Sequence, residues 1–493
     1  MGARRTSAPA RRTPATPARE VALAVLRAVA DRDAYANLLL PALLAERGLT
    51  GRDAALATEL AYGTLRGRGS YDAVLAACST RALADIDPPL LDVLRLGAHQ
   101  LLATRIGPHA AVATSVELAR TAAGQGAAGF ANAVLRRVAT RDLDSWIAAV
   151  APDRAADPVG YLAVKTSHPA WIVAAISEAL GEEPGTGLPL TETALDANGT
   201  RPRVALCATP GLATQAELVA RGARATQWSP FGAYSDGGDP ADIPEVRQGR
   251  AGVQDEASQL AALALTRAAV STTDIGVTDT GTTGTGADNA GASDRRWLDL
   301  CAGPGGKARL LAGLAAGRDA HLVAADVREH RARLVSAATA ATGVTAAIVA
   351  DGTEPAWRPG SFDRVIADVP CSGLGALRRR PDARWRKSPA DVAALGPLQR
   401  ALLRTAIDAA RPGGVIAYVT CSPHVAETRE VVEDVAAARS DVAVLDTPAL
   451  LGEVPSLACP APSGRYAQFW PHLHGTDAIF IAVLQKGQAP SGS

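Results

Sequence analysis

The sequence has few cysteines and no long apolar run, and each scarcity excludes a class of protein. Its six cysteines include no C-x-x-C pair, so we expect neither a disulfide framework nor a zinc site. No run of about 18 apolar residues occurs, so no transmembrane helix is predicted. The N-terminus is rich in Arg, Pro and Ala without an apolar core, which argues against a secretory signal. These absences favour a cytoplasmic protein that binds no metal and no membrane.

The chain also lacks net charge, because 50 Lys and Arg residues balance 50 Asp and Glu residues. A net charge of zero over several domains can conceal local patches of positive or negative charge, so this balance does not exclude a nucleic-acid partner. Hydrophobic residues make up 47% of the chain, which is enough to bury cores along most of it. At roughly 150 residues per domain, the length predicts about three domains.

Apolar periodicity divides the chain into three domains and two segments without a core. Residues 1–19 are an Arg-rich leader, which is either disordered or in contact with RNA. Residues 20–150 carry apolar residues at helical spacing and predict an all-α bundle. Residues 151–250 mix strands and helices and predict a small α+β module. Residues 251–486 alternate strands with helices, which predicts a doubly wound α/β sheet with an antiparallel edge, interrupted by a disordered insertion at 270–294.

A glycine-rich loop and two strand-end acids predict a nucleoside-cofactor site in the α/β domain. The loop, at 299–307, follows the first strand and opens a helix, where glycines let a ligand approach the backbone. Asp326 ends the second strand, where an acid can accept hydrogen bonds from ribose hydroxyls. Asp351 ends the third strand, near where an adenine edge would lie. Because Lys307 is followed by Ala308, the loop is not a P-loop.

Two cysteines follow neighbouring strands of the same predicted sheet. Cys371 lies three residues after Asp368, at the end of the fourth strand, and Cys421 lies at the end of the fifth. A single cysteine at such a position is as often a small buried hydrophobe. Two of them beside an acid and a nucleoside cofactor favour nucleophilic addition to a pyrimidine ring. Cys301, within the glycine-rich loop, is predicted to serve packing.

A basic segment, ALRRRPDARWRK, directly follows the Cys371 strand end. Its six Arg and Lys residues outnumber its single acid, Asp382, and give a local charge of +5. With Trp385 as a stacking face, the segment suits phosphate contact around an unstacked base. The alternative is a solvated charged loop without a partner. The basic residues are Arg378, Arg379, Arg380, Arg384, Arg386 and Lys387.

These motifs resemble those of the NOL1/NOP2/Sun family, the RNA (cytosine-5) methyltransferases that use S-adenosylmethionine. The matching segments are 299–307, 368–371 and 420–422. Helical segments such as LAYGTLRGR and FANAVLRRV resemble the NusB-type RNA-binding domain of the family's bacterial Sun/Fmu branch, whose substrate is 16S rRNA. The chain departs from the family pattern at Gly303, where alanine is usual, and at Ala478, where glycine is usual. The resemblance implies a Rossmann-like class I methyltransferase domain.

The resemblance also implies a role for each motif residue. Cys421 would add to carbon 6 of the cytosine, and Cys371 would assist removal of the carbon-5 proton and release of the enzyme. Asp368 would hydrogen-bond the base near the methionine end of the cofactor. Asp326 would hold the ribose and Asp351 the adenine of S-adenosylmethionine. The remaining residues that would line the cofactor are Cys301, Ala302, Gly303, Pro304, Gly305, Gly306 and Lys307.

Three alternative functions stay open beside a monomeric 16S rRNA cytosine-5 methyltransferase. A tRNA methyltransferase is disfavoured only by the NusB-like helices. A noncatalytic RNA-binding factor for ribosome assembly or antitermination is disfavoured by Asp368 and the two cysteines. A small-molecule methyltransferase is disfavoured by the cysteine pair and by the basic segment.

Overall fold

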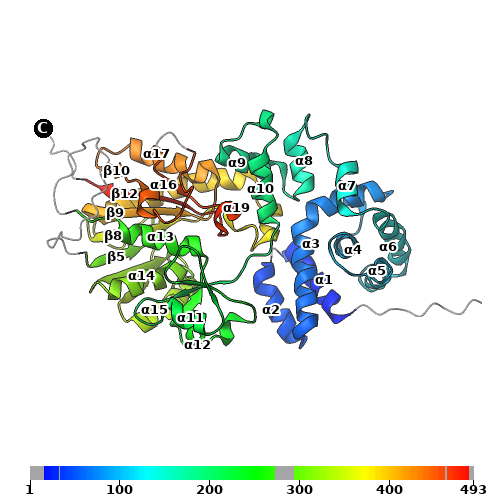
Figure 1. The fold of residues 1–493 in the computed structure, drawn as a ribbon, viewed down its shortest axis with the longest axis horizontal. Coiled ribbons are helices and arrows are strands. Elements are labelled where there is room, and N and C mark those ends of the chain that lie inside the picture. The colour runs from blue at the N-terminus through cyan, green and yellow to red at the C-terminus, as the bar shows by residue number, and fades with distance from the viewer. Residues whose placement is uncertain (1–15, 33, 272–293, 461–463, 488–493) are drawn as a thin grey trace, which may run out of the picture. The chain divides into compact units, whose positions relative to one another are not determined.

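A computed structural model describes residues 16–32, 34–271, 294–460 and 464–487. Most of the predicted leader, 1–19, and of the predicted insertion, 270–294, lies outside the described residues. The described chain forms two compact units (Figure 1). The first unit draws its described residues from the ranges Met1–Ala174, Pro184–Gly199 and Leu377–Arg386, and the second takes the rest of the described chain.

The first unit is built from helices packed around one apolar core. Apolar residues of its longer helices meet there, and Leu60, Leu94 and Leu135 are fully buried. This confirms the prediction of an all-α bundle. The α-helices that precede residue 200 in the described chain are α1 (Pro17–Arg32), α2 (Ala36–Glu46), α3 (Gly51–Cys78), α4 (Pro88–Ala103), α5 (Pro108–Ala123), α6 (Gln125–Val138), α7 (Leu143–Val150), α8 (Pro158–Lys165), α9 (Ala170–Leu180) and α10 (Pro189–Asn198).

The segment Leu377–Arg386 belongs to the helical unit, although its neighbours in sequence belong to the second unit. Arg384 in this segment is fully buried. It donates hydrogen bonds to the backbone oxygens of Arg66 and Ser167, at 3.1 Å each, and of Asn198, at 2.7 Å. Burial lowers the pKa of Arg384 to about 9. The three carbonyl groups offset part of the cost of burying this guanidinium.

Trp385 packs on α3 at Gly69, where an added Cβ would lie 2.6 Å from a carbon of the indole ring. The Arg68 guanidinium lies over the same ring, 5.5 Å from its centroid. The sequence predicted an RNA-contacting or solvated loop here, and both predictions are wrong for Arg378 and Arg384, which are buried. Charge patterning could not reveal this, because buried arginines that bind backbone carbonyls look like solvated ones in sequence.

The second unit begins with a small antiparallel sheet of four strands in the order β2-β3-β1-β4. Helices α11 (Gln215–Ala220) and α12 (Pro244–Arg247) pack against it. Strands and helices thus mix here as expected, but residues 151–174 and 184–199 of the predicted 151–250 module belong to the first unit, and the described chain forms two units where three domains were predicted. The strands are β1 (Ala205–Ala208), β2 (Arg224–Ala225), β3 (Gly232–Tyr234) and β4 (Ala251–Val253).

The large sheet of the second unit has the strand order β10-β12-β9-β8-β5-β6-β7, with β11 paired to β12. The strands β5 to β9 run parallel, whereas β12 pairs antiparallel with β9 and β10 pairs antiparallel with β12. This confirms the predicted parallel sheet with an antiparallel edge. The strands are β5 (Arg296–Asp299), β6 (His321–Asp326), β7 (Thr345–Val349), β8 (Phe362–Asp368), β9 (Ala410–Thr420), β10 (Val442–Val444), β11 (Ala467–Gln468) and β12 (Phe480–Lys486).

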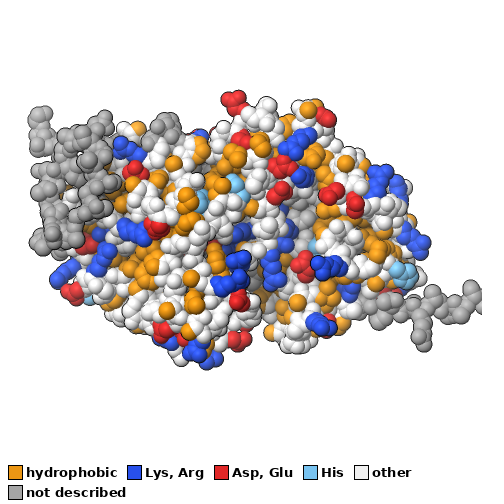
Figure 2. All heavy atoms as spheres, in the orientation of Figure 1, with side chains coloured by type: hydrophobic (Ala, Val, Ile, Leu, Met, Phe, Trp, Pro, Cys, Tyr) orange, Lys and Arg blue, Asp and Glu red, His pale blue; other side chains and the backbone are white. Residues whose placement is uncertain are grey.

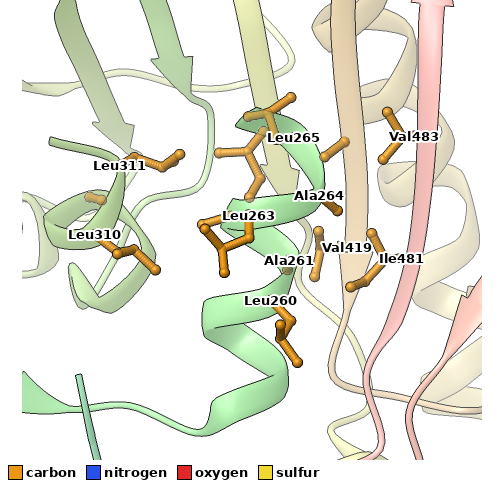
Figure 3. Packing of buried hydrophobic residues seen from close by; sticks show 14 of the residues in the cluster. Leu260, Ala261, Leu263, Ala264, Leu265, Leu310, Leu311, Val419, Ile481 and Val483 are labelled. Carbon is orange, nitrogen blue, oxygen red and sulfur yellow. The ribbon is translucent and has the colours of Figure 1, made fainter. Parts of the chain in front are cut away.

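Helices cover both faces of this sheet, so its strands are apolar on both sides. On one face, α13 and α14 share a core with Ile366 and Val419, and Figure 3 shows α13 packed against strand residues that include Val419. On the other face, α16 and α17 pack with Val365 and Tyr418. The helices are α13 (Glu256–Arg267), α14 (Gly306–Ala316), α15 (Glu329–Thr339), α16 (Pro389–Ala409), α17 (Arg429–Ala437), α18 (Thr447–Leu450) and α19 (Pro471–His474).

The surface carries charges of both signs. Figure 2 shows basic and acidic side chains interspersed over the visible face, in keeping with the zero net charge of the chain. Within the described ranges, no helix combines the length and the apolar character that crossing a membrane requires.

We predict that Gly69→Ala destabilises the helical unit, whereas Gly129→Ala in α6 stabilises it. The new Cβ at position 69 meets the Trp385 ring, and such overpacking typically costs about 1–3 kcal/mol. At the exposed Gly129, an added Cβ meets no described atom within 4 Å outside its own helix. At position 129 the remaining effect is the higher helix propensity of alanine than of glycine, which raises the free energy of unfolding by up to about 1 kcal/mol. Urea denaturation followed by circular dichroism measures both changes, and equal shifts of the two midpoints would contradict the Trp385 contact.

Candidate active site

Parallel strands of the large sheet end at one edge, and their last residues carry the polar side chains predicted to be functional. Strand pairing sets Asp299 of β5 opposite Ile366 of β8, and Asp368 of β8 opposite Val419 of β9. Side chains alternate along a strand, so Asp299 and Asp368 face the side of the sheet that α13 and α14 cover. Cys421 follows Val419 by two residues and continues the same alternation. The fold thus directs these groups toward the glycine-rich loop that opens α14.

The two cysteines meet at this edge. Cys371 Sγ lies 3.1 Å from Cys421 Sγ, within hydrogen-bond range for sulfur, and both residues are partly buried. The Cys421 backbone oxygen accepts a hydrogen bond of 2.9 Å from Gly375, which ties the two loops together. The hydrogen bond with Cys421 and burial raise the pKa of Cys371 well above its usual value. Two thiols at this distance hold one negative charge far more easily than two.

Lys307, at the start of α14, brings a positive charge to the same place. Its Nζ donates a hydrogen bond to Asp368 Oδ2 at 2.8 Å and another to Ser258 Oγ at 3.3 Å. Burial disfavours the charge on this lysine, but the Asp368 carboxylate outweighs burial and raises the pKa of Lys307, with Cys421 contributing in the same direction. The site therefore holds a Lys307–Asp368 ion pair beside the thiols.

The glycine-rich loop packs closely on Asp326, at the end of β6. Asp326 accepts hydrogen bonds from the backbone of Gly303 at 3.1 Å and of Arg328 at 2.9 Å, and its carboxylate lies 3.5 Å from Arg331 Nε. A Cβ at Gly303 would lie 2.4 Å from Asp326 Oδ2. Gly305 has φ of +110°, which glycine adopts most readily. Of the predicted cofactor-lining residues in this loop, Ala302, Gly303 and Gly305 are buried, Cys301, Gly306 and Lys307 are half-buried, and Pro304 is exposed.

Asp299 is fully buried and interacts with the Lys307–Asp368 ion pair. Burial and the nearby Asp368 carboxylate raise the pKa of Asp299 to about 8, and Lys307 with the Cys301 backbone offsets only part of this. Burial and Asp299 also raise the pKa of the Cys301 thiol. Cys301 packs against the apolar core on the α16 side, where it has the packing role predicted for it.

Asp351 is not brought into this cluster. It follows β7, which is separated from β8 by β5 and β6, and its side chain is exposed. Its Oδ1 accepts hydrogen bonds from Thr353 N at 2.8 Å and Thr353 Oγ1 at 2.7 Å, which lower the pKa of Asp351. In the described part of the chain, no three His, Cys, Asp or Glu side chains gather in a way that could hold a metal ion.

One buried acid of this site, Glu427, was not predicted from the sequence. It lies in the short turn Val425–Glu427 after Cys421 and is fully buried. It accepts hydrogen bonds from the backbone N–H and the hydroxyl of Ser372, the residue after Cys371. No local pattern could have marked it, because its partners lie 55 residues away in sequence.

The sequence matches two families that together cover most of its length. Residues 290–485 match the family described as 16S rRNA methyltransferase RsmB/F, and residues 16–140 match the NusB family. The chain is 50% identical, over 97% of its length, to a Mycobacterium tuberculosis protein provisionally named methyltransferase Rv1407, of which 98% is covered.

More distant relatives extend this comparison. The chain is 30% identical to the ribosomal RNA small subunit methyltransferase B of Pseudomonas putida, with 96% of this chain and 99% of that protein covered. Among solved structures, the crystal structure of PH0851 matches with a TM-score of 0.72 and 18% identity, over 96% of this chain and 99% of that one. This last likeness bears on the fold alone.

We predict that Asp299→Asn stabilises the protein relative to wild type more at about pH 9 than at about pH 5.5. A carboxyl with a raised pKa binds more protons in the folded state, so its contribution to stability is lost as pH rises toward about 8. Asparagine stays neutral and avoids this loss. Thermal unfolding at both pH values measures the difference.

The matched control is Asp351→Asn, at an exposed carboxylate. Because the pKa of Asp351 is lowered, it is ionised at both pH values, and its replacement should give the same change at each. A pH-independent effect of Asp299→Asn would contradict a buried carboxyl that titrates near pH 8.

Proposed function

This chain belongs to the RsmB/F family of 16S rRNA methyltransferases, and on that premise we propose that it methylates carbon 5 of a cytosine in 16S rRNA through a covalent cysteine adduct. The family assignment makes the protein a methyltransferase that acts on small-subunit rRNA. The carbon-5 position and the covalent route are our proposal. The observation that supports them most is the contact of Cys371 with Cys421, at 3.1 Å, beside the Lys307–Asp368 ion pair.

The residues at the end of β5 and β6 fit S-adenosylmethionine. When bound, this cofactor supplies a methyl group on a positively charged sulfur. Asp326 would hold the ribose hydroxyls, because the backbone groups of Gly303 and Arg328 already fix its carboxylate. The close packing of Gly303 and the backbone conformation of Gly305 would keep the loop open to the cofactor. Asp351 would reach the adenine from its exposed position.

Cys421 would act as the nucleophile. Its thiolate would form a bond to carbon 6, and the electrons of the carbon 5–carbon 6 double bond would make carbon 5 nucleophilic. Lys307 lies close enough to favour the thiolate, since Cys421 and Lys307 interact electrostatically. Asp368, held by Lys307 at 2.8 Å, would hydrogen-bond the base and orient it.

Cys371 would assist the last stage of the reaction. In that stage a solvent water takes the proton from carbon 5, the electrons of that carbon–hydrogen bond form the double bond again, and the bond between carbon 6 and Cys421 sulfur breaks with its electrons staying on the Cys421 thiolate. Because its sulfur lies 3.1 Å from Cys421 Sγ, Cys371 is placed to stabilise the departing thiolate by a hydrogen bond. Without this help the adduct should persist.

The substrate would be recognised by the helical unit as well as by the catalytic site. This rests on the match of residues 16–140 to the NusB family. An rRNA substrate would place the enzyme in the cytoplasm, where ribosomal subunits assemble. Bisulfite sequencing of rRNA and tRNA from cells with and without the gene tests the proposal. A cytosine in 16S rRNA should lose its methylation; a change confined to tRNA, or no change, would contradict the proposal.

We predict that Cys421→Ala abolishes methyl transfer, whereas Cys371→Ala accumulates a covalent protein–RNA adduct. The first variant lacks the nucleophile, and the second can form the adduct but resolves it slowly. Methyl transfer to RNA and a shifted band on a denaturing gel measure the two effects. Cys459→Ala, which alters a buried cysteine in a core of the same unit, is the control and should show neither. A Cys371→Ala enzyme that turns over freely would refute the roles proposed for the two cysteines.

We further predict that Gly303→Ala weakens S-adenosylmethionine binding several-fold, although alanine is usual in the family at this position. Its Cβ would displace the Asp326 carboxylate, from which it would lie 2.4 Å away. Calorimetric titration measures the Kd. Gly452→Ala, after α18, is a control outside the site, because the atom nearest to its added Cβ is the Ala449 oxygen at 3.7 Å. An unchanged Kd in Gly303→Ala would show that Asp326 does not hold the ribose.

A further inference from the structure

The two cysteine loops are joined by a buried carboxylate that has no role in the proposed reaction steps. Glu427 Oε1 accepts hydrogen bonds from Ser372 N at 2.7 Å and from Gln399 Nε2 at 3.2 Å. Its Oε2 accepts one from the Ser372 hydroxyl. Gln399 also donates to the Pro370 oxygen at 2.9 Å, so both residues that flank Cys371 are fixed.

The hydrogen bonds of this network have a defined direction. An ionised carboxylate only accepts, so the single hydrogen of the Ser372 hydroxyl points to Glu427. Ser372 Oγ must then accept the hydrogen of Ser422 Oγ, 3.1 Å away. Ser422 Oγ in turn accepts from the backbone N–H of His424 at 3.2 Å. The residues that follow the two cysteines are therefore bridged just as the two sulfur atoms are.

The charges around the two sulfur atoms differ. Glu427 and Asp368 both act on Cys371 and disfavour its thiolate, and the buried Tyr418 hydroxyl lies near enough to interact with it as well. Lys307 is the cation of the cluster, and Cys421 is the cysteine with which it interacts. Two carboxylates thus oppose a negative charge on the Cys371 sulfur, and the Lys307 charge favours one on the Cys421 sulfur.

We propose that Glu427 is a positioning residue that keeps the proton of the thiol pair on Cys371 and leaves the negative charge on Cys421. Glu427 does so in two ways. It anchors Cys371 through Ser372 and Gln399, and its negative charge opposes a second negative charge on the adjacent sulfur. Cys371 then offers a hydrogen-bond donor to Cys421, 3.1 Å away.

This inference rests on the proposed function, because it explains why one of two neighbouring cysteines is the nucleophile. Hydrogen bonds from Cys371 and the field of Lys307 favour the Cys421 thiolate before attack. The same Cys371 hydrogen can stabilise the Cys421 thiolate when it leaves. The reactivity of the free thiols nevertheless follows from the charges alone, so it can be measured without RNA or cofactor.

The test is alkylation of the full-length protein with iodoacetamide across a pH series, with labelling at each cysteine quantified by peptide mass spectrometry. In wild type, Cys421 should be labelled first, and Cys371 only at higher pH. In Glu427→Gln, which keeps the shape but removes the charge, the labelling midpoint of Cys371 should fall by about one pH unit, a tenfold rise in thiolate at a given pH. With RNA, this variant should lose kcat at least several-fold and keep its KM for S-adenosylmethionine.

Two further variants separate charge from structure. Glu430→Gln, the same change at an exposed position of α17 three residues away, should leave the Cys371 midpoint where it is in wild type. Ser422→Ala removes the bridge between the serines but keeps Glu427, and it should shift the midpoint much less than Glu427→Gln. If both Ser422→Ala and Glu427→Gln shift it equally, Glu427 acts only through packing and the proposal fails.

The wild-type measurement keeps the inference falsifiable even if Glu427→Gln does not fold. Labelling of Cys371 before Cys421 in wild type would overturn it directly. Failure of the proposed function is a separate result, because it would appear as methyl transfer that survives Cys421→Ala. In that case the inference about the thiol charges would still hold, provided that Cys421 is labelled before Cys371.

Discussion

The register between β8 and β9 is the constraint on which the site depends. Asp368 pairs with Val419, and the Val369 N–H donates to the Val419 oxygen at 3.0 Å. This register ends both strands at the same level, so that Cys371 and Cys421 leave the sheet side by side. A slip of one residue would turn every following side chain to the opposite face. The burial of both faces makes such a slip costly, because apolar residues of both strands pack into the two cores.

The site concentrates groups whose charges are expensive to bury, and their arrangement limits that cost. Lys307 neutralises Asp368 and leaves Asp299, deeper in the fold, to be held with its proton up to about pH 8. The two thiols lie 3.1 Å apart, where one negative charge is held more easily than two. Glu427 is satisfied by three hydrogen bonds from Ser372 and Gln399. Each carboxylate thus has its own donors or its own proton.

The helical unit shows that a dense run of arginines need not be a surface for a partner. Arg384 is buried against three backbone oxygens, and Trp385 occupies the space that Gly69 leaves on α3. This segment directly follows the loop of Cys371 in sequence. The chain therefore connects the proposed thiol site and the helical unit within about a dozen residues.

The sequence alone determined the fold class and the order of its parts. Helical periodicity before residue 150, and strands alternating with helices after residue 295, reflect local geometry that every fold with this pattern shares. It also indicated Asp326, Asp368 and the two cysteines, because residues at the carboxyl ends of parallel strands converge whatever the details of packing.

Only the tertiary structure decided which of these groups touch and which are buried. Glu427 reaches Ser372, and Gln399 reaches Glu427 and Pro370, across long stretches of chain. No local pattern marks such contacts. Arg384, in a segment predicted to contact RNA or solvent, is buried. Asp351, predicted to lie near the adenine of the cofactor, is exposed. Burial and charge pairing are properties of distant neighbours, and these set the pKa values and the thiol geometry on which the proposed chemistry rests.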